Sequence, residues 1–133
     1  MKSILRSGKR RTAIARAIIK GGTGKILING KPLEIIEPEI VRMKLQEPFY
    51  FVDEKTKNST DIKVKVKGGG YMGQADAART AIARALLAWV DSEQLRAKFS
   101  EYDRHMIVGD PRRREPKHFG GPGARAKYTK SYR

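Results

Sequence analysis

The chain has 133 residues and a mass of 15.0 kDa, enough for one modest hydrophobic core and too little for two. It has no cysteine, which excludes disulfides and thiolate metal sites, and no apolar stretch long enough for a signal peptide or a membrane-spanning helix. A formal net charge of +15 points to an anionic partner. We favour nucleic acid over a membrane surface, because glycines and a proline at 120–123 prevent the basic C-terminal segment from forming an amphipathic helix.

The positive charge is concentrated at the two ends of the chain. Residues 1–25 contain eight Lys and Arg and no acid, and residues 111–133 contain eight more with only one Glu. The middle holds 13 basic and 13 acidic residues and is neutral. This distribution predicts a small folded body that presents basic segments to a large polyanion.

Taken in chain order, the first predicted element is a β-hairpin. Residues 9–20 alternate, with Ala13, Ala15, Ala17 and Ile19 on one side. Four residues, three of them glycine, separate this stretch from residues 25–28, a lysine followed by three aliphatic residues, which we take as the second strand. Asn29-Gly30 is then a turn, and Pro32 ends the strand region.

A helix is predicted from Pro38, with acidic neighbours that suit a helix N-terminus, and it should end before Pro48. Its expected apolar face consists of Ile40, Val41, Met43 and Leu45. Residues 49–52 are expected to be extended, and residues 55–60 to form a polar loop.

Residues 61–67 alternate strictly and predict a strand whose lysines face solvent. A helix over about 74–90 follows, with one apolar face: Ala75, Ala78, Ile82, Leu86 and Trp89. Asp91 and Gln94 resemble a capping box that starts a shorter helix carrying Leu95, Phe99 and Tyr102. The order of elements predicts a two-layer α+β sandwich over residues 1–108 and an extended basic tail over 109–133.

Residues 68–73 match the G-x-G-x-x-G pattern between a predicted strand and a predicted helix. A dinucleotide-binding fold would also need a second parallel strand, ending in an acid about twenty residues on. Asp91 is near that distance but follows the helix directly. We therefore expect a tight turn in which Gly69 and Gly70 expose backbone N–H groups that can hold an RNA phosphate.

No cluster of residues supports catalysis or metal binding. His105 and His118 are thirteen positions apart and have no partner at ligand spacing. We read Asp103, Asp110 and Glu115 as counter-charges for Arg104 and for the arginines at 112–114.

A run of basic residues is usually only a solvated surface. The tail departs from this expectation because aromatic residues are interleaved with the cations: His118, Phe119, Tyr128 and Tyr132. Such rings stack on unpaired bases, at about 1–3 kcal/mol for each base. A tail with so few apolar side chains is expected to become ordered only on its partner.

Several short motifs follow one another along the chain in a characteristic order and at characteristic spacings: residues 8–13, 24–30, 68–75, 83–86, 110–117 and 130–133. In this order they resemble the universal small-subunit ribosomal protein nine family, in its archaeal and eukaryotic form. The resemblance covers nearly the whole chain and implies a non-enzymatic protein of the ribosomal protein S5 domain 2-like fold. It also implies a cytoplasmic ribosomal location in the head of the small subunit, with rRNA and neighbouring head proteins as partners and no cofactor or small-molecule substrate.

In this family the last residues approach the anticodon stem-loop of peptidyl-site tRNA. By position, that role falls on Lys130, Ser131, Tyr132 and Arg133. Bacterial members end in a different, Lys-Arg type motif, so we expect different contact chemistry at this tip.

The predicted rRNA contacts comprise basic, glycine and aromatic residues of the body and tail: Lys9, Arg10, Arg11, Lys63, Lys65, Lys67, Gly69, Gly70, Arg112, Arg113, Arg114, Lys117, His118, Arg125, Lys127 and Tyr128. If about eight tail cations neutralise phosphates, the log–log salt slope is roughly −6 to −7. Two alternatives remain: a DNA-compacting protein, which would bind duplex DNA as tightly as RNA, and a nucleotide-using enzyme built around 68–73.

Overall fold

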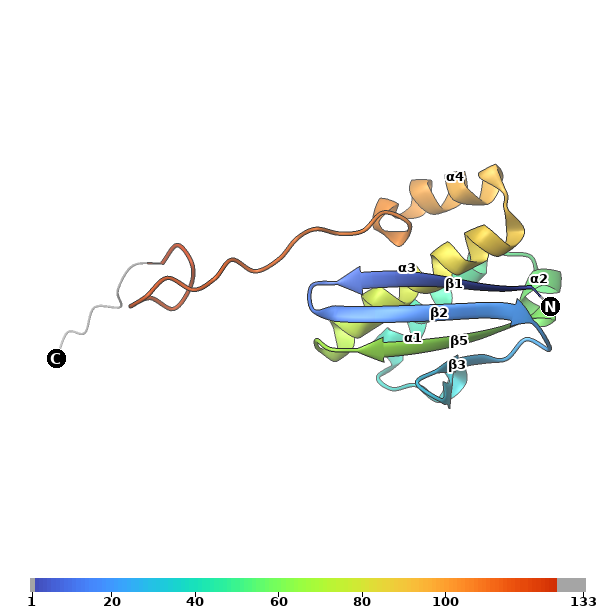
Figure 1. Cartoon of the computed structure of the whole chain (residues 1–133), viewed down its shortest axis with the longest axis horizontal. Helices are drawn as coiled ribbons and strands as arrows, with labels where there is room; N and C mark the ends of the chain where they lie inside the picture. Colours follow the sequence, from blue (N-terminus) through green and yellow to red (C-terminus); the bar gives the residue numbers. More distant parts are fainter. Residues whose placement is uncertain (1, 127–133) are drawn as a thin grey trace.

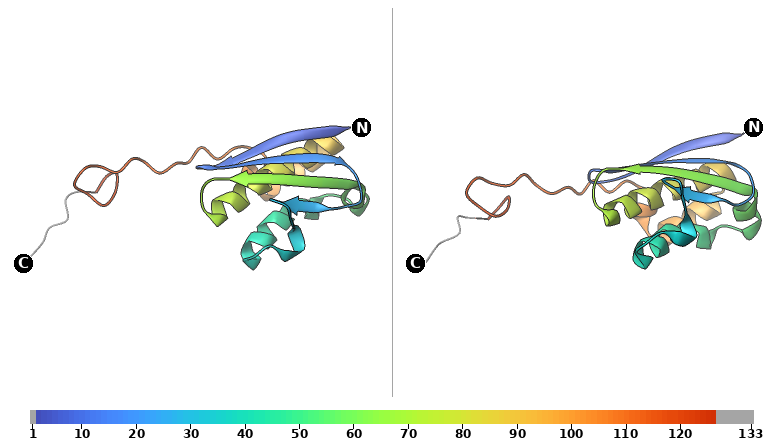
Figure 2. Two further views of the ribbon diagram at one scale, coloured as in Figure 1. Left: turned by 60° about the horizontal axis from the view of Figure 1, so that its bottom comes forward. Right: turned by 90° about the horizontal axis from the view of Figure 1, so that it is seen from below.

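Helices cover one face of a five-stranded sheet and leave the other face open (Figure 1), as the two further views confirm (Figure 2). The computed structural model describes residues 2–126. The strands are β1 (Ser3–Arg10), β2 (Ala13–Gly21), β3 (Ile26–Ile28), β4 (Lys31–Pro32) and β5 (Thr60–Lys67). The helices are α1 (Glu39–Gln46), α2 (Glu54–Ser59), α3 (Tyr71–Val90) and α4 (Glu93–Tyr102), with 3-10 turns η1 (Leu33–Ile35), η2 (Glu47–Phe51) and η3 (Arg104–Met106). This architecture confirms the predicted two-layer α+β sandwich.

The sheet has the order β1-β2-β5-β3-β4, and its neighbouring strands are antiparallel except for the parallel pair β3–β5. The predicted hairpin between residues 9–20 and 25–28 is therefore wrong. β2 pairs instead with β1, through a two-residue turn at Arg11 and Thr12, and β3 is carried past β2 to lie against β5. Asp61 explains this path, because its carboxylate accepts hydrogen bonds from the backbone N–H groups of residues 23–25 at 2.9–3.1 Å.

The core lies between the sheet and α3. The buried side of β2 is the predicted one, and its small alanines let α3 approach closely. Gly8 on β1 faces α3 so closely that an added Cβ would lie 2.2 Å from the carbonyl oxygen of Ala77. The largest fully buried side chains include Ile19, Ile62 and Phe99. Each such side chain contributes about 1.5–3 kcal/mol on burial.

The helix predicted from Pro38 is present as α1, with Pro38 immediately before its first residue. Only Val41 and Leu45 of its predicted apolar face are buried, whereas Ile40 and Met43 are exposed. Of residues 49–52 only Val52 is extended, because η2 includes Pro48 in its first turn, continues to Phe51 and buries Phe49. Most of the predicted polar loop is the helix α2. This helix buries no residue, so its sequence lacks the apolar periodicity from which a helix could be predicted.

The long helix α3 buries four residues of the predicted face and covers Trp89 only in part. The Lys2 ammonium lies 5.0 Å from the centre of the Trp89 ring. The predicted capping box is displaced by one residue, since the Ser92 hydroxyl accepts from the Leu95 N–H. Asp91 instead ends α3 in the left-handed conformation, with φ 54°.

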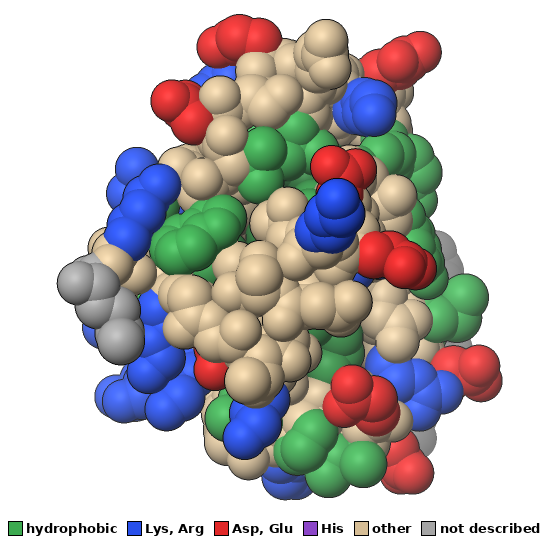
Figure 3. All heavy atoms as spheres, turned by 90° about the vertical axis from the view of Figure 1, so that its right-hand side faces the viewer, with side chains coloured by type: hydrophobic (Ala, Val, Ile, Leu, Met, Phe, Trp, Pro, Cys, Tyr) green, Lys and Arg blue, Asp and Glu red, His purple; other side chains and the backbone are tan. Residues whose placement is uncertain are grey.

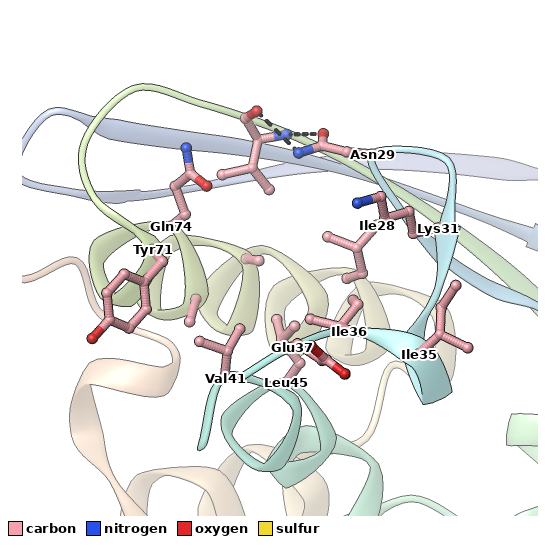
Figure 4. Close-up of a pocket in the computed structure, with 13 residues that line it drawn as sticks. Ile28, Asn29, Lys31, Ile35, Ile36, Glu37, Val41, Leu45, Tyr71 and Gln74 are labelled. Atoms are coloured by element: carbon pink, nitrogen blue, oxygen red, sulfur yellow. Dashed lines mark hydrogen bonds between the residues drawn. The ribbon is translucent and has the colours of Figure 1, made fainter. Parts of the chain in front are cut away.

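At the end of the sheet, Asn29 in the β3–β4 turn holds β5 through two hydrogen bonds to Val66, of 2.9 and 3.4 Å (Figure 4). Below this contact, Ile28, Val41 and Leu45 line a hollow between the sheet, α1 and α3 (Figure 4). No helix of residues 2–126 is long and apolar enough to cross a membrane.

Candidate nucleic-acid interface

The open face of the sheet carries six basic side chains. The pairing register places alternate residues of β1, β2 and β5 on this face, with these cations among them: Lys9, Arg16, Lys20, Lys63, Lys65 and Lys67. In the view from the end opposite the tail, a column of Lys and Arg side chains follows this face, and most of the acidic side chains in view lie away from it (Figure 3). The charge of this surface is therefore predominantly positive, and we call it the open basic face.

Like charges meet directly on the open basic face. Arg16 lies opposite Lys65 across the β2–β5 pair. Like charges at such cross-strand positions are unfavourable, and a bound polyanion would relieve the repulsion. The one acid of these three strands, Asp61, is engaged by the backbone N–H groups of residues 23–25, and these hydrogen bonds, with that of Lys25 the strongest, lower its pKa.

Aliphatic side chains separate the cations. Leu5 and Ile18 are directly opposite one another, and Ile14 lies between Lys9 and Lys67. All three aliphatic side chains are at least 42% exposed. A surface of ammonium groups and exposed aliphatic groups can contact phosphates together with the apolar faces of sugars and bases.

The glycine turn and the β1–β2 turn form one end of the sheet. Gly68 and Gly69 have φ of 78° and 67°, and an added Cβ on Gly68 would lie 2.6 Å from the carbonyl oxygen of Thr12. Arg11, also at positive φ, is exposed in the neighbouring turn. The structure therefore brings Arg11, Lys67 and the exposed Gly69 and Gly70 to the same end of the sheet.

The N-terminus of α3 opens at this end. Its first turn contains no acid, and Gly70 makes no side-chain cap. Backbone N–H groups at such a helix start favour an anion.

Arg10 occupies a different environment from the other predicted contacts. Its side chain is only 19% exposed, and its guanidinium binds the Asp110 carboxylate and lies 3.9 Å from Asp76. Asp76 in turn accepts from the Lys44 ammonium at 2.8 Å. These contacts hold the start of the tail against β1, where Arg10 and Asp110 also form an isolated parallel bridge.

Asp110 is shared between the body and the tail. Besides Arg10, it binds Arg112 through the side chain, at 2.6–3.0 Å, and through the backbone N–H, at 3.0 Å. Hydrogen bonds from Arg112, supported by the charge of Arg10, hold the pKa of Asp110 far below its usual range. The carboxylate is therefore ionised at neutral pH and neutralises part of the charge of both arginines.

The described part of the tail extends away from the body (Figure 1), and residues 111–126 contain no helix or strand. Arg113, Arg114 and Lys117 are exposed in it. The rings of His118 and Phe119 stack at 4.2 Å, within a turn closed by a 3.2 Å hydrogen bond from the His118 N–H to the Gly123 carbonyl. Arg125 donates to the Glu115 carboxylate at 2.8 and 3.1 Å.

The counter-charges differ in part from those predicted. Asp110 pairs with Arg112, as expected. Glu115 pairs with Arg125, and Asp103 accepts a hydrogen bond from Arg79 at 2.7 Å instead of pairing with Arg104. Six predicted contacts lie outside the described residues: Lys127, Tyr128, Lys130, Ser131, Tyr132 and Arg133. Within residues 2–126, no group of three His, Asp or Glu could hold a metal ion.

Sequence reasoning missed Arg16 and Lys20 on the open basic face. Both alternate with the buried residues of β2, so the period of two already contained the signal. Their neighbours across the sheet could not be predicted, because that requires knowing that β2 lies between β1 and β5.

Comparison with known proteins agrees with this description. The family model described as Ribosomal protein S9/S16 matches residues 8–133. The "Small ribosomal subunit protein uS9" of Methanothrix thermoacetophila is 55% identical over 133 residues, covering all of both chains. Proteins of the same name are 50% identical in Halobacterium salinarum, over 96% of each chain, and 49% identical in Desulfurococcus amylolyticus, over all of this chain and 94% of the relative.

Proposed function

The chain belongs to the ribosomal protein S9/S16 family and is a structural, non-enzymatic constituent of the ribosome, and we propose that its open basic face and its tail bind small-subunit rRNA in the subunit head. The observation that carries the proposal is the set of six cations on the open basic face, where Asp61, the one acid of β1, β2 and β5, is already engaged by backbone N–H groups. The relatives are named as small-subunit proteins. We propose that the protein acts in cytoplasmic ribosomes.

The body and the tail would contribute differently. The open basic face offers a fixed array, in which alternate residues of one strand are about 6.4–6.8 Å apart. The glycine turn adds backbone N–H groups at the start of α3. The tail would supply further phosphate contacts and stacking surfaces, with Arg113, Arg114, Lys117 and His118 exposed at its start.

The experiment on the body compares two triple variants of equal charge change in the full chain. Lys63, Lys65 and Lys67 are changed to Gln in one variant, and Lys55, Lys57 and Lys98, outside the open basic face, in the other. We expect the first variant to make the log–log salt slope of rRNA binding shallower by about 2–3 and the second to leave it nearly unchanged. Equal slopes for the two variants would contradict the role of the open basic face.

The tip of the tail is proposed to contact tRNA in the peptidyl site, as the family resemblance implies for Lys130, Ser131, Tyr132 and Arg133. A cation beside the tRNA backbone contributes about 1 kcal/mol, or roughly five-fold in affinity. Small subunits assembled with a chain that lacks residues 131–133 should therefore hold peptidyl-site tRNA about five-fold less tightly. Unchanged tRNA affinity and initiation fidelity would remove this part of the proposal.

A further inference from the structure

One part of this strongly basic protein is acidic. Residues 47–54 contain three acids and no Lys or Arg, and residues 91–103 contain four acids and two bases. The fold brings these two segments together, because Phe51 of η2 packs against Phe99 and Tyr102 of α4, with ring centres 5.5 and 5.1 Å apart. The acidic surface belongs to the helical layer and not to the open basic face.

An aromatic groove lies between the two segments. Tyr50, Phe51 and Asp53 line one side, and Lys98, Glu101 and Tyr102 the other. Tyr50 and Tyr102 are 66% and 54% exposed, although their rings are large and apolar. The hollow continues along α4 towards Ser92 and Gln94, so an extended segment of several residues fits along this helix of ten residues, about 15 Å long.

Acidic side chains outnumber basic ones around the groove. Glu47 of η2 binds the Arg79 guanidinium at 2.5 Å. Even with that cation nearby, the negative charge of Glu47 is the main cause that raises the pKa of the Tyr102 phenol. Asp53 and Glu101 add two further carboxylates at the rim against one ammonium, that of Lys98.

This chemistry selects against RNA and for a basic peptide. Phosphates would meet carboxylates, whereas a Lys or Arg side chain would find both carboxylate partners and the faces of two tyrosines. The described part of the chain's own tail begins after η3 and extends away from the body, so it does not fill the groove (Figure 1). We propose that the groove of residues 50–53 and 98–102 is the docking site for a Lys- or Arg-bearing segment of a neighbouring small-subunit protein, an inference that rests on the proposed function.

Photo-crosslinking in assembled small subunits tests the proposal. Tyr50 and Tyr102 are replaced, one at a time, by a diazirine-bearing amino acid, which reacts with protein and RNA alike. Both sites are exposed, so the fold should tolerate the probe. A third chain carries the same probe at Lys65 on the open basic face.

We expect probes at 50 and 102 to capture a peptide of another protein with Lys or Arg in the crosslinked stretch, and the probe at 65 to capture rRNA. A Tyr102→Ala change should lower the crosslinking yield from position 50 about five-fold and leave the yield at 65 unchanged.

Four results would overturn the inference while the probe at 65 still captures rRNA: capture of rRNA at 50 and 102, of the chain's own tail, of a peptide without Lys or Arg, or of nothing. Failure of the unmodified chain to enter small subunits would instead defeat the proposed function, and the inference with it.

Discussion

At the scale of single residues, Gly8 allows the closest approach in the fold. A Cβ at this position would meet the Ala77 carbonyl oxygen at 2.2 Å and the Ala81 nitrogen at 2.6 Å, both backbone atoms of α3 that cannot rotate away. The body therefore depends on a missing side chain to bring β1 against α3.

The substitution Gly8→Ala should destabilise the protein by about 1–3 kcal/mol, because α3 or β1 must shift. For a domain of this size, each kcal/mol lowers Tm by roughly 4 °C. Thermal unfolding followed by circular dichroism measures the change. Gly21→Ala is the matched control, since that strand glycine has no atom within 4 Å of an added Cβ, and equal Tm values for the two variants would contradict the packing account.

Asp61 is the residue whose ionisation matters for the path of the chain. Its pKa is lowered by backbone hydrogen bonds, so the charged form is favoured by folding and its contribution is complete above the unfolded pKa of about 3.9. That contribution is lost as the pH falls through the lower, folded-state pKa.

The variant Asp61→Asn should therefore be less stable than the parent chain at pH 7, and the difference should shrink towards pH 2. Urea midpoints at the two pH values measure it. Asp53→Asn has the same charge change, but the Asp53 side chain makes no cap hydrogen bond. A stability difference for Asp61→Asn that is independent of pH would show that the carboxylate charge is not what holds the loop of residues 23–25.

At the scale of elements, the joint between the body and the tail is the contact of greatest consequence. Asp110 binds Arg10 on β1 and Arg112 in the tail, so one carboxylate fixes where the tail leaves the sheet. If the tail binds rRNA as proposed, holding its start in place before binding lowers the entropic cost of binding.

Asp110→Asn should loosen this joint without unfolding the body. Backbone NMR order parameters for residues 110–113 should fall from those of a rigid backbone, near 0.85, towards those of a flexible segment, below 0.6. Glu115→Gln serves as the control, since Glu115 binds only within the tail, to Arg125. Unchanged order parameters in Asp110→Asn would show that the parallel bridge alone fixes the joint.

The elements that the sequence predicted well are those with a strong period. β5 alternates over its full length, and α3 repeats small apolar residues on a face that is buried. β1 has only two adjacent aliphatic residues, and its turn to β2 contains Arg11 where Gly or Asn would normally give the signal. The glycine-rich segment after β2 was the stronger local signal, and it led to the wrong hairpin partner.

For the candidate site, the sequence identified the cations but not their partners. Lys63, Lys65 and Lys67 follow from the strand period. The half-buried state of Arg10 does not, because Asp110 is one hundred positions away in the chain. Nor could the sequence show that residues 50–53 and 98–102 form the aromatic groove, since residues 49–52 were expected to be extended.

At the scale of the whole molecule, the chain separates three surfaces by charge. The open basic face lies on one side of the sheet, and residues of η2 and α4 in the helical layer line the aromatic groove. The tail leaves from one end of the body (Figure 1). A protein with this layout can bind RNA on one face while it meets a protein on another. The tail adds cations without adding helix or strand in its described part, so its removal should leave the body intact.

The most direct measurement is salt-dependent binding of the full chain and of a 1–110 chain to small-subunit rRNA, with duplex DNA as competitor. Eight Lys and Arg follow residue 110, of which Arg112 and Arg125 already bind carboxylates. We therefore predict that truncation makes the log–log slope shallower by roughly 4–7, while both chains prefer rRNA over DNA. Equal binding to duplex DNA, or an unchanged slope after truncation, would contradict the account of a structured-RNA binder whose tail supplies much of the electrostatic affinity.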